Sequence, residues 1–387
     1  MKTKPICFMV VFLYALCLLL IALPLCAQET APASEDAVPQ KAGGVKGLED
    51  RLNRLEQAIG REVQSDKWYD RIQISGLIEV EAIYLDFVDK QDPTADTKES
   101  DVELATVELV VDAKIAKHVD GHVMFKYEAD EVFVDEGFVT LVGTETFPAY
   151  LIAGRQYVPF GYYESFFVTD PTTLVLGETN QDAAVAGYRF GGEMFDIAVG
   201  AFNGEIDKAG DDDVIDSFVA ALTASFMDGK LMAGASYTSN LASSDTFSVV
   251  IEDNGTTELT DLVGAWSAFV TVDFLERFQL IGEYVGALDD FEAGEIFDPA
   301  LDKKRKPTAW NVEFGALILE DLGLSVRYGG SDDGGDFLPE KQYGAVLNWG
   351  IWQCNLALEY LHDEFDDTDL AVDQEADTFT VQLAVEF

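Results

Sequence analysis

The sequence predicts an all-β fold, a transmembrane antiparallel up-and-down β-barrel of about 16 strands preceded by a short periplasmic helix. Three observations predict it: an apolar leader, long stretches in which apolar and polar residues alternate, and a C-terminal strand that ends in Phe. Alternation at period two gives a strand one apolar face. These stretches run for about ten residues or more, the length that a tilted strand needs to cross a bilayer.

Residues 1–27 are expected to be a secretory signal peptide. Lys2 and Lys4 precede an unbroken apolar run over 6–25, and Ala27 provides a small residue for cleavage. The alternative is a retained membrane anchor, because the apolar run is long enough to span a bilayer.

Two segments are expected between this leader and the barrel, which is predicted over 68–387. Residues 28–44 are small, polar and Pro-containing, as in a flexible linker. Residues 45–63 are predicted to form a short coiled-coil helix with an apolar stripe of Val45, Leu48, Leu52, Leu55 and Ile59. The stripe covers only about two heptads, so a lone amphipathic helix is the alternative. In a homotrimer, three copies of the helix would meet.

Acidic residues dominate the composition. The chain has 71 Asp and Glu against 25 Lys and Arg, a formal net charge of −46. This charge excludes nucleic acid as a partner, because phosphate binding requires a basic face. Aromatic residues make up 12% of the chain, whereas disordered acidic chains contain few. Cys354 is the single cysteine after the leader, so no intramolecular disulfide is expected.

The strands are predicted from alternation and from the turn residues between them. The last strand places Phe379, Val381, Leu383, Val385 and Phe387 on one face, and it resembles the terminal assembly signal of outer-membrane barrel proteins. The predicted ranges are 72–87, 102–116, 121–130, 133–142, 148–157, 182–191, 194–203, 214–226, 230–241, 261–273, 277–288, 308–320, 323–331, 340–350, 353–363 and 377–387.

Connections between these strands alternate in length. Turns of about three residues, such as 191–193 and 227–229, alternate with long polar stretches such as 242–260 and 289–307. Short periplasmic turns and long extracellular loops are typical of barrels in the bacterial outer membrane, where lipid surrounds the strands. Aromatic pairs near strand ends fit girdles at the two membrane interfaces: Trp68 and Tyr69, Tyr84 and Phe87, Tyr162 and Tyr163, Trp349 and Trp352.

The connection from Val158 to Gln181 is predicted to fold into the lumen and to narrow it. Its apolar residues seek burial: Phe160, Phe166, Phe167, Leu174 and Leu176. Glu164, Asp170 and Glu178 would then face the channel as part of an acidic ring, as in cation channels. The alternative is that this loop packs against a neighbouring subunit of a trimer.

Charged side chains of the strands are expected to point into the lumen, because charges that face lipid are costly. The expected pore-lining bases are Lys114, Lys126, Arg155, Arg189 and Arg327. The expected pore-lining acids are Glu108, Asp112, Glu128, Glu283, Glu313 and Glu359. The excess of acids favours a water-filled channel for small solutes that prefers cations. The alternative is a non-conducting structural or binding barrel.

No enzymatic, metal or cofactor site is expected. His118 and His122 straddle a predicted turn instead of sharing a helix face, and no nucleophile elbow or nucleotide-binding glycine pattern occurs. The acidic loops, such as Asp211–Asp213, lack the spacing of a dedicated calcium loop, so solvated loops are expected.

The stretch Gly154-Arg155-Gln156-Tyr157-Val158-Pro159-Phe160-Gly161, followed by Asp170-Pro171 and Leu176-Gly177-Glu178-Thr179, resembles the LbtU-type siderophore porins. The sequence is also similar, more distantly, to the phosphate-selective porins, although it lacks their basic ladder. The likeness spans most of the mature chain. It implies an outer-membrane channel connected with the uptake of ferric siderophores, and it marks Arg155 and the following loop as the characteristic segment.

Overall fold

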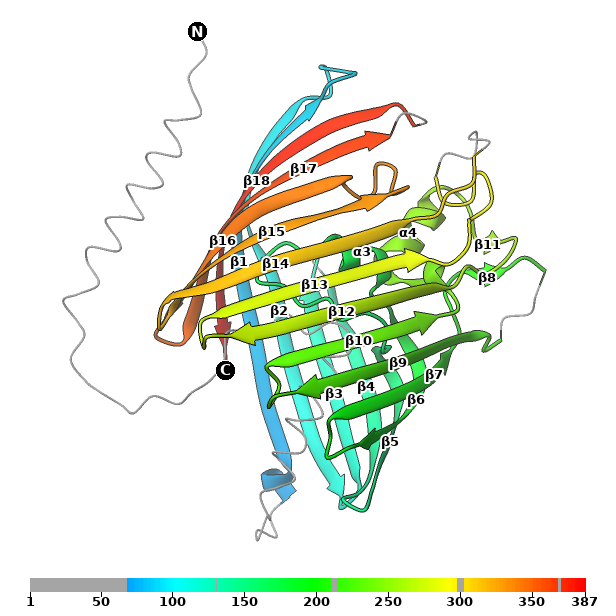
Figure 1. Cartoon of the computed structure of the whole chain (residues 1–387), viewed down its shortest axis with the longest axis vertical. Helices are drawn as coiled ribbons and strands as arrows, with labels where there is room; N and C mark the ends of the chain where they lie inside the picture. The colour runs from blue at the N-terminus through cyan, green and yellow to red at the C-terminus, as the bar shows by residue number, and fades with distance from the viewer. Residues whose placement is uncertain (1–67, 130, 211–213, 298–302, 368–369) are drawn as a thin grey trace, which may run out of the picture. The chain divides into compact units, whose positions relative to one another are not determined.

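The computed structural model describes residues 68–129, 131–210, 214–297, 303–367 and 370–387. The predicted leader, linker and coiled-coil helix lie outside these residues, and so does Asp211–Asp213. One sheet of sixteen antiparallel strands closes into a barrel, as the sequence predicted (Figure 1). In the described part of the chain, no helix has both the length and the apolar character to cross a membrane.

Each predicted strand corresponds to one observed strand, with ends that differ by a few residues. The barrel strands are β1 (Ile72–Asp89), β2 (Thr97–Ala116), β3 (Val119–Glu128), β4 (Glu131–Thr144), β5 (Phe147–Tyr157), β6 (Asn180–Phe190), β7 (Phe195–Phe202), β9 (Ser217–Phe226), β10 (Leu231–Thr238), β12 (Ala265–Phe274), β13 (Phe278–Ala287), β14 (Thr308–Leu319), β15 (Leu322–Asp332), β16 (Lys341–Ile351), β17 (Cys354–Asp367) and β18 (Val372–Glu386). A short 3-10 helix, η2 (Trp68–Arg71), precedes β1.

The barrel closes where β1 pairs with β18. The N–H of Gly76 donates to the carbonyl of Phe387 at 2.9 Å, and the N–H of Phe387 donates back to Gly76 at 3.1 Å. A Cβ on Gly76 would lie 2.5 Å from the Phe387 ring, so the site has no room for a side chain there. The C-terminal Phe is therefore part of the closing seam.

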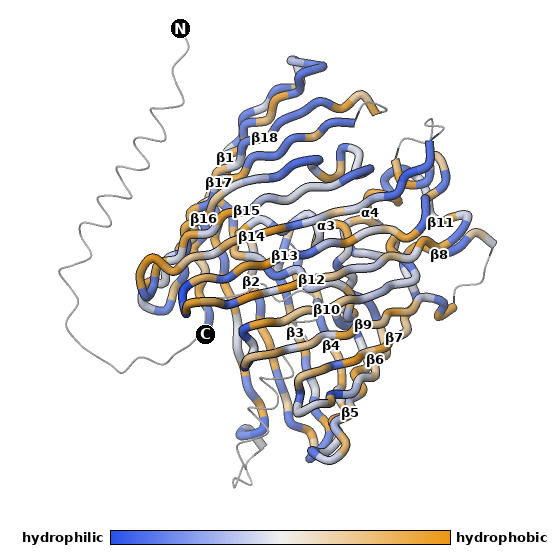
Figure 2. The backbone as a smooth tube through the Cα atoms, in the orientation of Figure 1, coloured by the Kyte–Doolittle hydropathy of each residue, from blue (hydrophilic) through white to orange (hydrophobic). Residues whose placement is uncertain are grey.

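Apolar and polar residues alternate along the barrel strands (Figure 2). Toward the long-loop rim, an outer aromatic belt contributes one ring from each successive strand from β10 round to β1: Tyr237, Trp266, Tyr284, Trp310, Tyr328, Tyr343, Tyr360, Phe379 and Tyr84. Further rings pack together near the short turns, among them Phe190 on Phe195 and Phe274 on Phe278. Tyr162 and Tyr163 were wrongly assigned to a girdle, because both are buried in the loop after β5.

The long loops are packed together instead of being solvated along their length. They contain η3 (Leu241–Ser243), α3 (Thr172–Gly177), α4 (Asp245–Asp253) and a small parallel sheet of β8 (Asp207–Lys208) and β11 (Glu258–Leu259). One apolar cluster joins them, with Leu176, Phe202, Phe247, Phe291 and Leu338 among its buried members. These segments are packed because apolar residues at helical spacing in α4 bury Phe247 and Ile251. Of the acidic clusters, Asp289 and Asp290 are exposed.

Candidate functional site

The connection between β5 and β6, residues 158–179, crosses the lumen and is called the lumen loop. The N–H of Val158 donates to the carbonyl of Thr179 at 2.9 Å and closes the base of the loop. Gly161 has φ +75°, and a Cβ there would lie 2.0 Å from the Tyr163 ring. This glycine therefore permits the sharp turn that sends the chain toward the opposite wall. Phe160 and Leu176 are buried, as their apolar character predicted.

On the opposite wall, Glu283 of β13 receives the first part of the lumen loop. Its carboxylate accepts the backbone N–H groups of Tyr162 at 2.6 Å and Tyr163 at 2.9 Å. Hydroxyls of Thr173 and Ser267 donate to the same carboxylate, each at 3.2 Å. A buried carboxylate with several donors of this kind is stabilised where it lies, because its desolvation is offset by hydrogen bonds.

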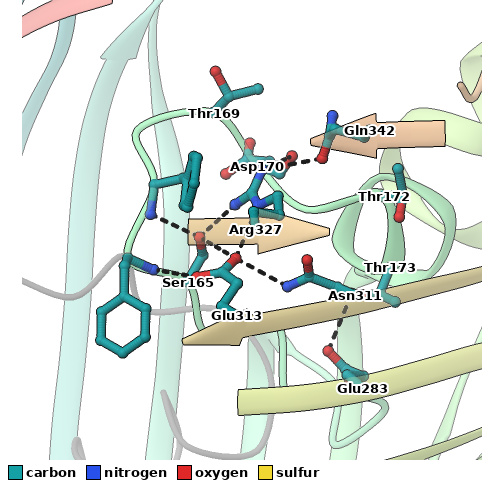
Figure 3. Close-up of polar contacts among 12 residues, drawn as sticks. Ser165, Thr169, Asp170, Thr172, Thr173, Glu283, Asn311, Glu313, Arg327 and Gln342 are labelled. Carbon is teal, nitrogen blue, oxygen red and sulfur yellow. Dashed lines mark hydrogen bonds and ion pairs between the residues drawn. The ribbon is translucent and has the colours of Figure 1, made fainter. Parts of the chain in front are cut away.

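Glu313 of β14 receives the next part of the loop, together with Arg327 of β15 (Figure 3). The Ser165 hydroxyl and the Phe166 N–H donate to its two oxygens, each at 2.8 Å. Arg327 Nε donates to Glu313 Oε1 at 2.9 Å, and its guanidinium stacks 4.3 Å from the centre of the Phe167 ring. Neither charge of this pair reaches solvent.

Glu359 of β17 binds the third part of the lumen loop, at Val168 and Thr169. It accepts the N–H of Val168 at 2.6 Å and the hydroxyl of Thr169 at 2.6 Å. Glu283, Glu313 and Glu359 are only 6%, 0% and 4% exposed. These three acids, which the sequence predicted to line the pore, therefore lie beneath the lumen loop, and Arg327 lies there with them.

The wall formed by β2 and β3 carries the other predicted pore-lining charges. Glu108, Asp112, Lys114 and Lys126 are half-buried and Glu128 is exposed. Glu108 and Lys126 are Cα partners across the two strands, and Lys126 Nζ lies 2.8 Å from Glu128. The structure thus brings this group together and leaves it in contact with water.

Two predicted pore-lining bases, Arg189 and Arg155, belong neither to the residues beneath the lumen loop nor to the charges of β2 and β3. Arg189 of β6 donates to Asp196 at 3.1 Å and lies over the Tyr150 ring. Arg155 has Asp182 as its Cα partner across β5 and β6. Arg155 is half-buried and close enough to Asp245 to interact with it electrostatically, and its inward orientation stays a prediction.

The three acids of the lumen loop do not form one ring. Glu164 is 2% exposed, whereas Asp170 and Glu178 are half-buried. Burial, with Asp245 and Asp170 nearby, raises the pKa of Glu178 well above its ordinary value. The expectation that all three carboxylates face the channel was wrong for Glu164, because the apolar residues around it carry it into the packed part of the loop.

Hydrogen bonds that the sequence did not predict join the end of the lumen loop to α4, and this set of bonds is called the staple. Asp245 donates its N–H to the carbonyl of Glu178 at 2.8 Å, and its carboxylate accepts the N–H of Asn180 at 2.8 Å. Ser244 donates its hydroxyl to the carbonyl of Leu176 at 2.8 Å. Burial and the nearby Glu205 raise the pKa of Asp245 to about 7, although the Asn180 N–H opposes this shift. The sequence held one signal for this contact. Ser244 and Asp245 stand before an apolar run, a pattern typical of a helix N-terminus.

Among the residues that the structure describes, no group of three or more His, Cys, Asp or Glu side chains could hold a metal ion. The inner-wall carboxylates are placed to bind the loop or to face water.

Solved structures with the same fold are outer-membrane porins and channels. The outer membrane channel DcaP of Acinetobacter baumannii has a TM-score of 0.58 and 15% identity, over 82% of this chain and 97% of that chain. Salmonella typhi OmpF, in complex with daunomycin, has a TM-score of 0.55 and 11% identity, over 82% and 97%. An anion-selective porin from Comamonas acidovorans has a TM-score of 0.55 and 11% identity, over 81% and 99%. The chain therefore has the fold of these porins, and its closed barrel with an apolar outer surface belongs in the bacterial outer membrane.

Curated relatives are UPF0422 proteins. One from Coxiella burnetii is 28% identical over 261 residues, which is 63% of this chain and 55% of that protein. One from Legionella pneumophila strain Lens is 24% identical over 347 residues, which is 81% of this chain and 62% of that protein. The chain thus spans little more than half the length of the relatives it matches. No family model matches it.

Proposed function

We propose that the protein is an outer-membrane porin that lets small solutes, preferentially cations, pass through a lumen narrowed by the lumen loop. The observation that carries this proposal is the division of the inner wall. The lumen loop is held against β13, β14 and β17 by buried carboxylates, while five charged side chains of β2 and β3 keep contact with water: Glu108, Asp112, Lys114, Lys126 and Glu128. A barrel wall that faced a filled interior would bury its charges in pairs.

The cation preference is inferred from the charges on the part of the inner wall formed by β2 and β3, which is called the wet wall. Glu108, Asp112 and Glu128 lie there with Lys114 and Lys126, so carboxylates remain in excess after the covered acids are set aside. Rings of carboxylates favour cations in a pore. The acidic extracellular loops would also raise the local concentration of cations.

A homotrimer is part of the proposal. The outer aromatic belt spans β10 to β18 and continues on β1, but the outward row that continues from Tyr237 by strand pairing holds Ala220, Val199, Ala186 and Leu151 on β9, β7, β6 and β5. Each of these residues is the Cα partner of the next. A row without large rings suits close contact with another copy better than contact with the lipid interface, where aromatic side chains are favoured. Analytical ultracentrifugation in detergent tests the trimer.

The uptake of ferric siderophores is proposed on the resemblance to the LbtU-type siderophore porins. An acidic wet wall would admit a neutral or cationic ferric chelate more readily than an anionic one. Addition of such a chelate to one side of a bilayer should then interrupt the ionic current in discrete, concentration-dependent events.

The second candidate is a non-conducting structural or binding barrel, which is favoured by the apolar cluster that joins the long loops. Conductance and reversal potential of the purified protein in a planar bilayer under a KCl gradient distinguish the two. Large conductance steps with a reversal potential of the sign for K⁺ selectivity support the porin. A barrel that inserts but stays closed supports the second candidate, and anion selectivity contradicts the proposed cation preference.

A further inference from the structure

Lys126 of β3 is a base surrounded by carboxylates from several segments. Its Nζ lies 2.8 Å from Glu128 Oε2, and its Cα partner on β2 is Glu108. Asp135 of β4 and Glu178 of the lumen loop are also close enough to interact with it electrostatically. The Lys126 side chain is 18% exposed and that of Glu128 is 49% exposed. The ammonium group therefore lies among acids at the edge of the wet lumen.

A bulge places Asp135 in this group. The register between β3 and β4 shifts beside Met124, and Asp135 is the extra residue of β4. Such a bulge re-aims a side chain that regular alternation would send to the other face. The Tyr157 hydroxyl and the Asn180 Nδ2 both donate to the Asp135 carboxylate, at 3.2 Å. Asp135 is thus fixed where the lumen loop rejoins the wall, close enough to interact electrostatically with Lys126.

We propose that Lys126 is a tethered counter-ion that sets the ionic selectivity of the channel; this role rests on the proposed function. Its ammonium group neutralises part of the charge of Glu108, Glu128 and Asp135. A monovalent cation that passes then meets a weaker negative potential. It can take the place of the ammonium group beside the carboxylates. A divalent cation, which oxygen ligands would otherwise hold, is repelled by the positive charge already in place.

Lys114 offers a matched control on the neighbouring strand. It is also half-buried on the wet wall, but its Cα partner is Asp120 and it lies nearer the short turn between β2 and β3. Removal of this charge changes the net charge of the wall by the same amount without touching the group around Lys126.

The experiment records planar-bilayer currents of the full-length protein in a KCl gradient, and then with MgCl₂ added. The variants are Lys126→Met, Lys126→Gln, Lys126→Arg and Lys114→Met. We expect Lys126→Met and Lys126→Gln to raise the K⁺ over Cl⁻ permeability ratio and to lower the Mg²⁺ concentration that blocks the K⁺ current by about tenfold. Lys126→Arg should stay close to the wild type, whereas Lys114→Met should raise the permeability ratio by less than the neutral variants at position 126 and leave the Mg²⁺ block unchanged.

The outcomes separate the two proposals. One outcome overturns the role of Lys126 alone. In it, the wild type conducts cations, but Lys126→Met and Lys126→Gln have the same selectivity and Mg²⁺ block as Lys114→Met. A wild type without cation conductance contradicts the proposed function and this role with it. Two different neutral substitutions at position 126, with barrel content checked by circular dichroism, guard against a folding defect in one of them.

Discussion

Two stretches of the inner wall carry the same residue types and use them differently. On β13, β14 and β17, Glu283, Glu313 and Glu359 are buried and accept hydrogen bonds from the lumen loop. On β2 and β3, Glu108 is half-buried and Glu128 is exposed, so both keep contact with water. The acids of the first stretch act as anchors, and those of the second are available to ions.

This difference shows that the acidic count of a barrel wall is not a measure of its selectivity. A loop without regular structure must find acceptors for its N–H groups, and a carboxylate can accept several at once. Part of the acidic excess on the inner wall is therefore used to hold the loop. Four substitutions or conditions, ordered by the size of their expected effect, test this division.

The largest effect is expected from Glu313→Ala. It leaves the Arg327 guanidinium buried without its carboxylate partner, which typically costs about 3–5 kcal/mol. We expect a large drop in the temperature at which the barrel unfolds in detergent, together with larger and noisier conductance steps as the loop detaches. Glu128→Ala, at an exposed acid of the wet wall, is the control and should leave the unfolding temperature nearly unchanged. Equal losses in both variants would contradict the anchoring role.

Gly161→Ala should have the next largest effect. Its φ of +75° disfavours a side chain, and a Cβ would lie 2.0 Å from the Tyr163 ring. Gly192→Ala is a matched control, because its φ is +70° but nothing lies within 4 Å of an added Cβ. Both variants carry backbone strain of about 1–3 kcal/mol, so the extra loss in Gly161→Ala measures the contact with Tyr163. Thermal unfolding measures the loss of stability in both variants. Equal losses would show that the Tyr163 ring moves away from the added Cβ at little cost.

The staple between the lumen loop and α4 should depend on pH. The pKa of Asp245 is about 7 in the stapled state against an ordinary value of 3.8, so the stapled state binds more protons between these values. The staple is then fully stable below about pH 4 and loses stability as the pH rises toward 7. The raised pKa of Glu178 acts in the same direction. Hydrogen exchange of 172–180 should quicken over this range, and Asp245→Asn should flatten the change. A rate that falls with pH, once corrected for intrinsic exchange, would contradict the assignment.

The smallest effect on stability is expected at the wet wall itself. Glu108→Gln removes one partner of the group around Lys126 and should change the free energy of unfolding by about 0.5 kcal/mol or less. Its reversal potential in a KCl gradient should nevertheless move toward zero. Unchanged selectivity in this variant would mean that ions pass elsewhere in the lumen.

The barrel could be predicted from the sequence because period-two alternation is local and recurs in every strand. The inward course of the lumen loop followed from apolar residues such as Phe160 and Leu176, which a solvated loop would not carry. The anchors could not be predicted, because Tyr162 and Glu283 are 121 positions apart and meet only in the folded barrel. Asp135 was missed because a bulge breaks the alternation on which the inward assignments depend.

The most direct test of the divided wall compares two triple variants in planar bilayers under a KCl gradient. One neutralises the wet wall with Glu108→Gln, Asp112→Asn and Glu128→Gln, and the other neutralises the anchors with Glu283→Gln, Glu313→Gln and Glu359→Gln. We predict that the first loses most of its cation selectivity at nearly unchanged conductance, whereas the second changes conductance and noise but stays cation-selective. Loss of selectivity in the anchor variant, with the wet-wall variant like the wild type, would contradict the account.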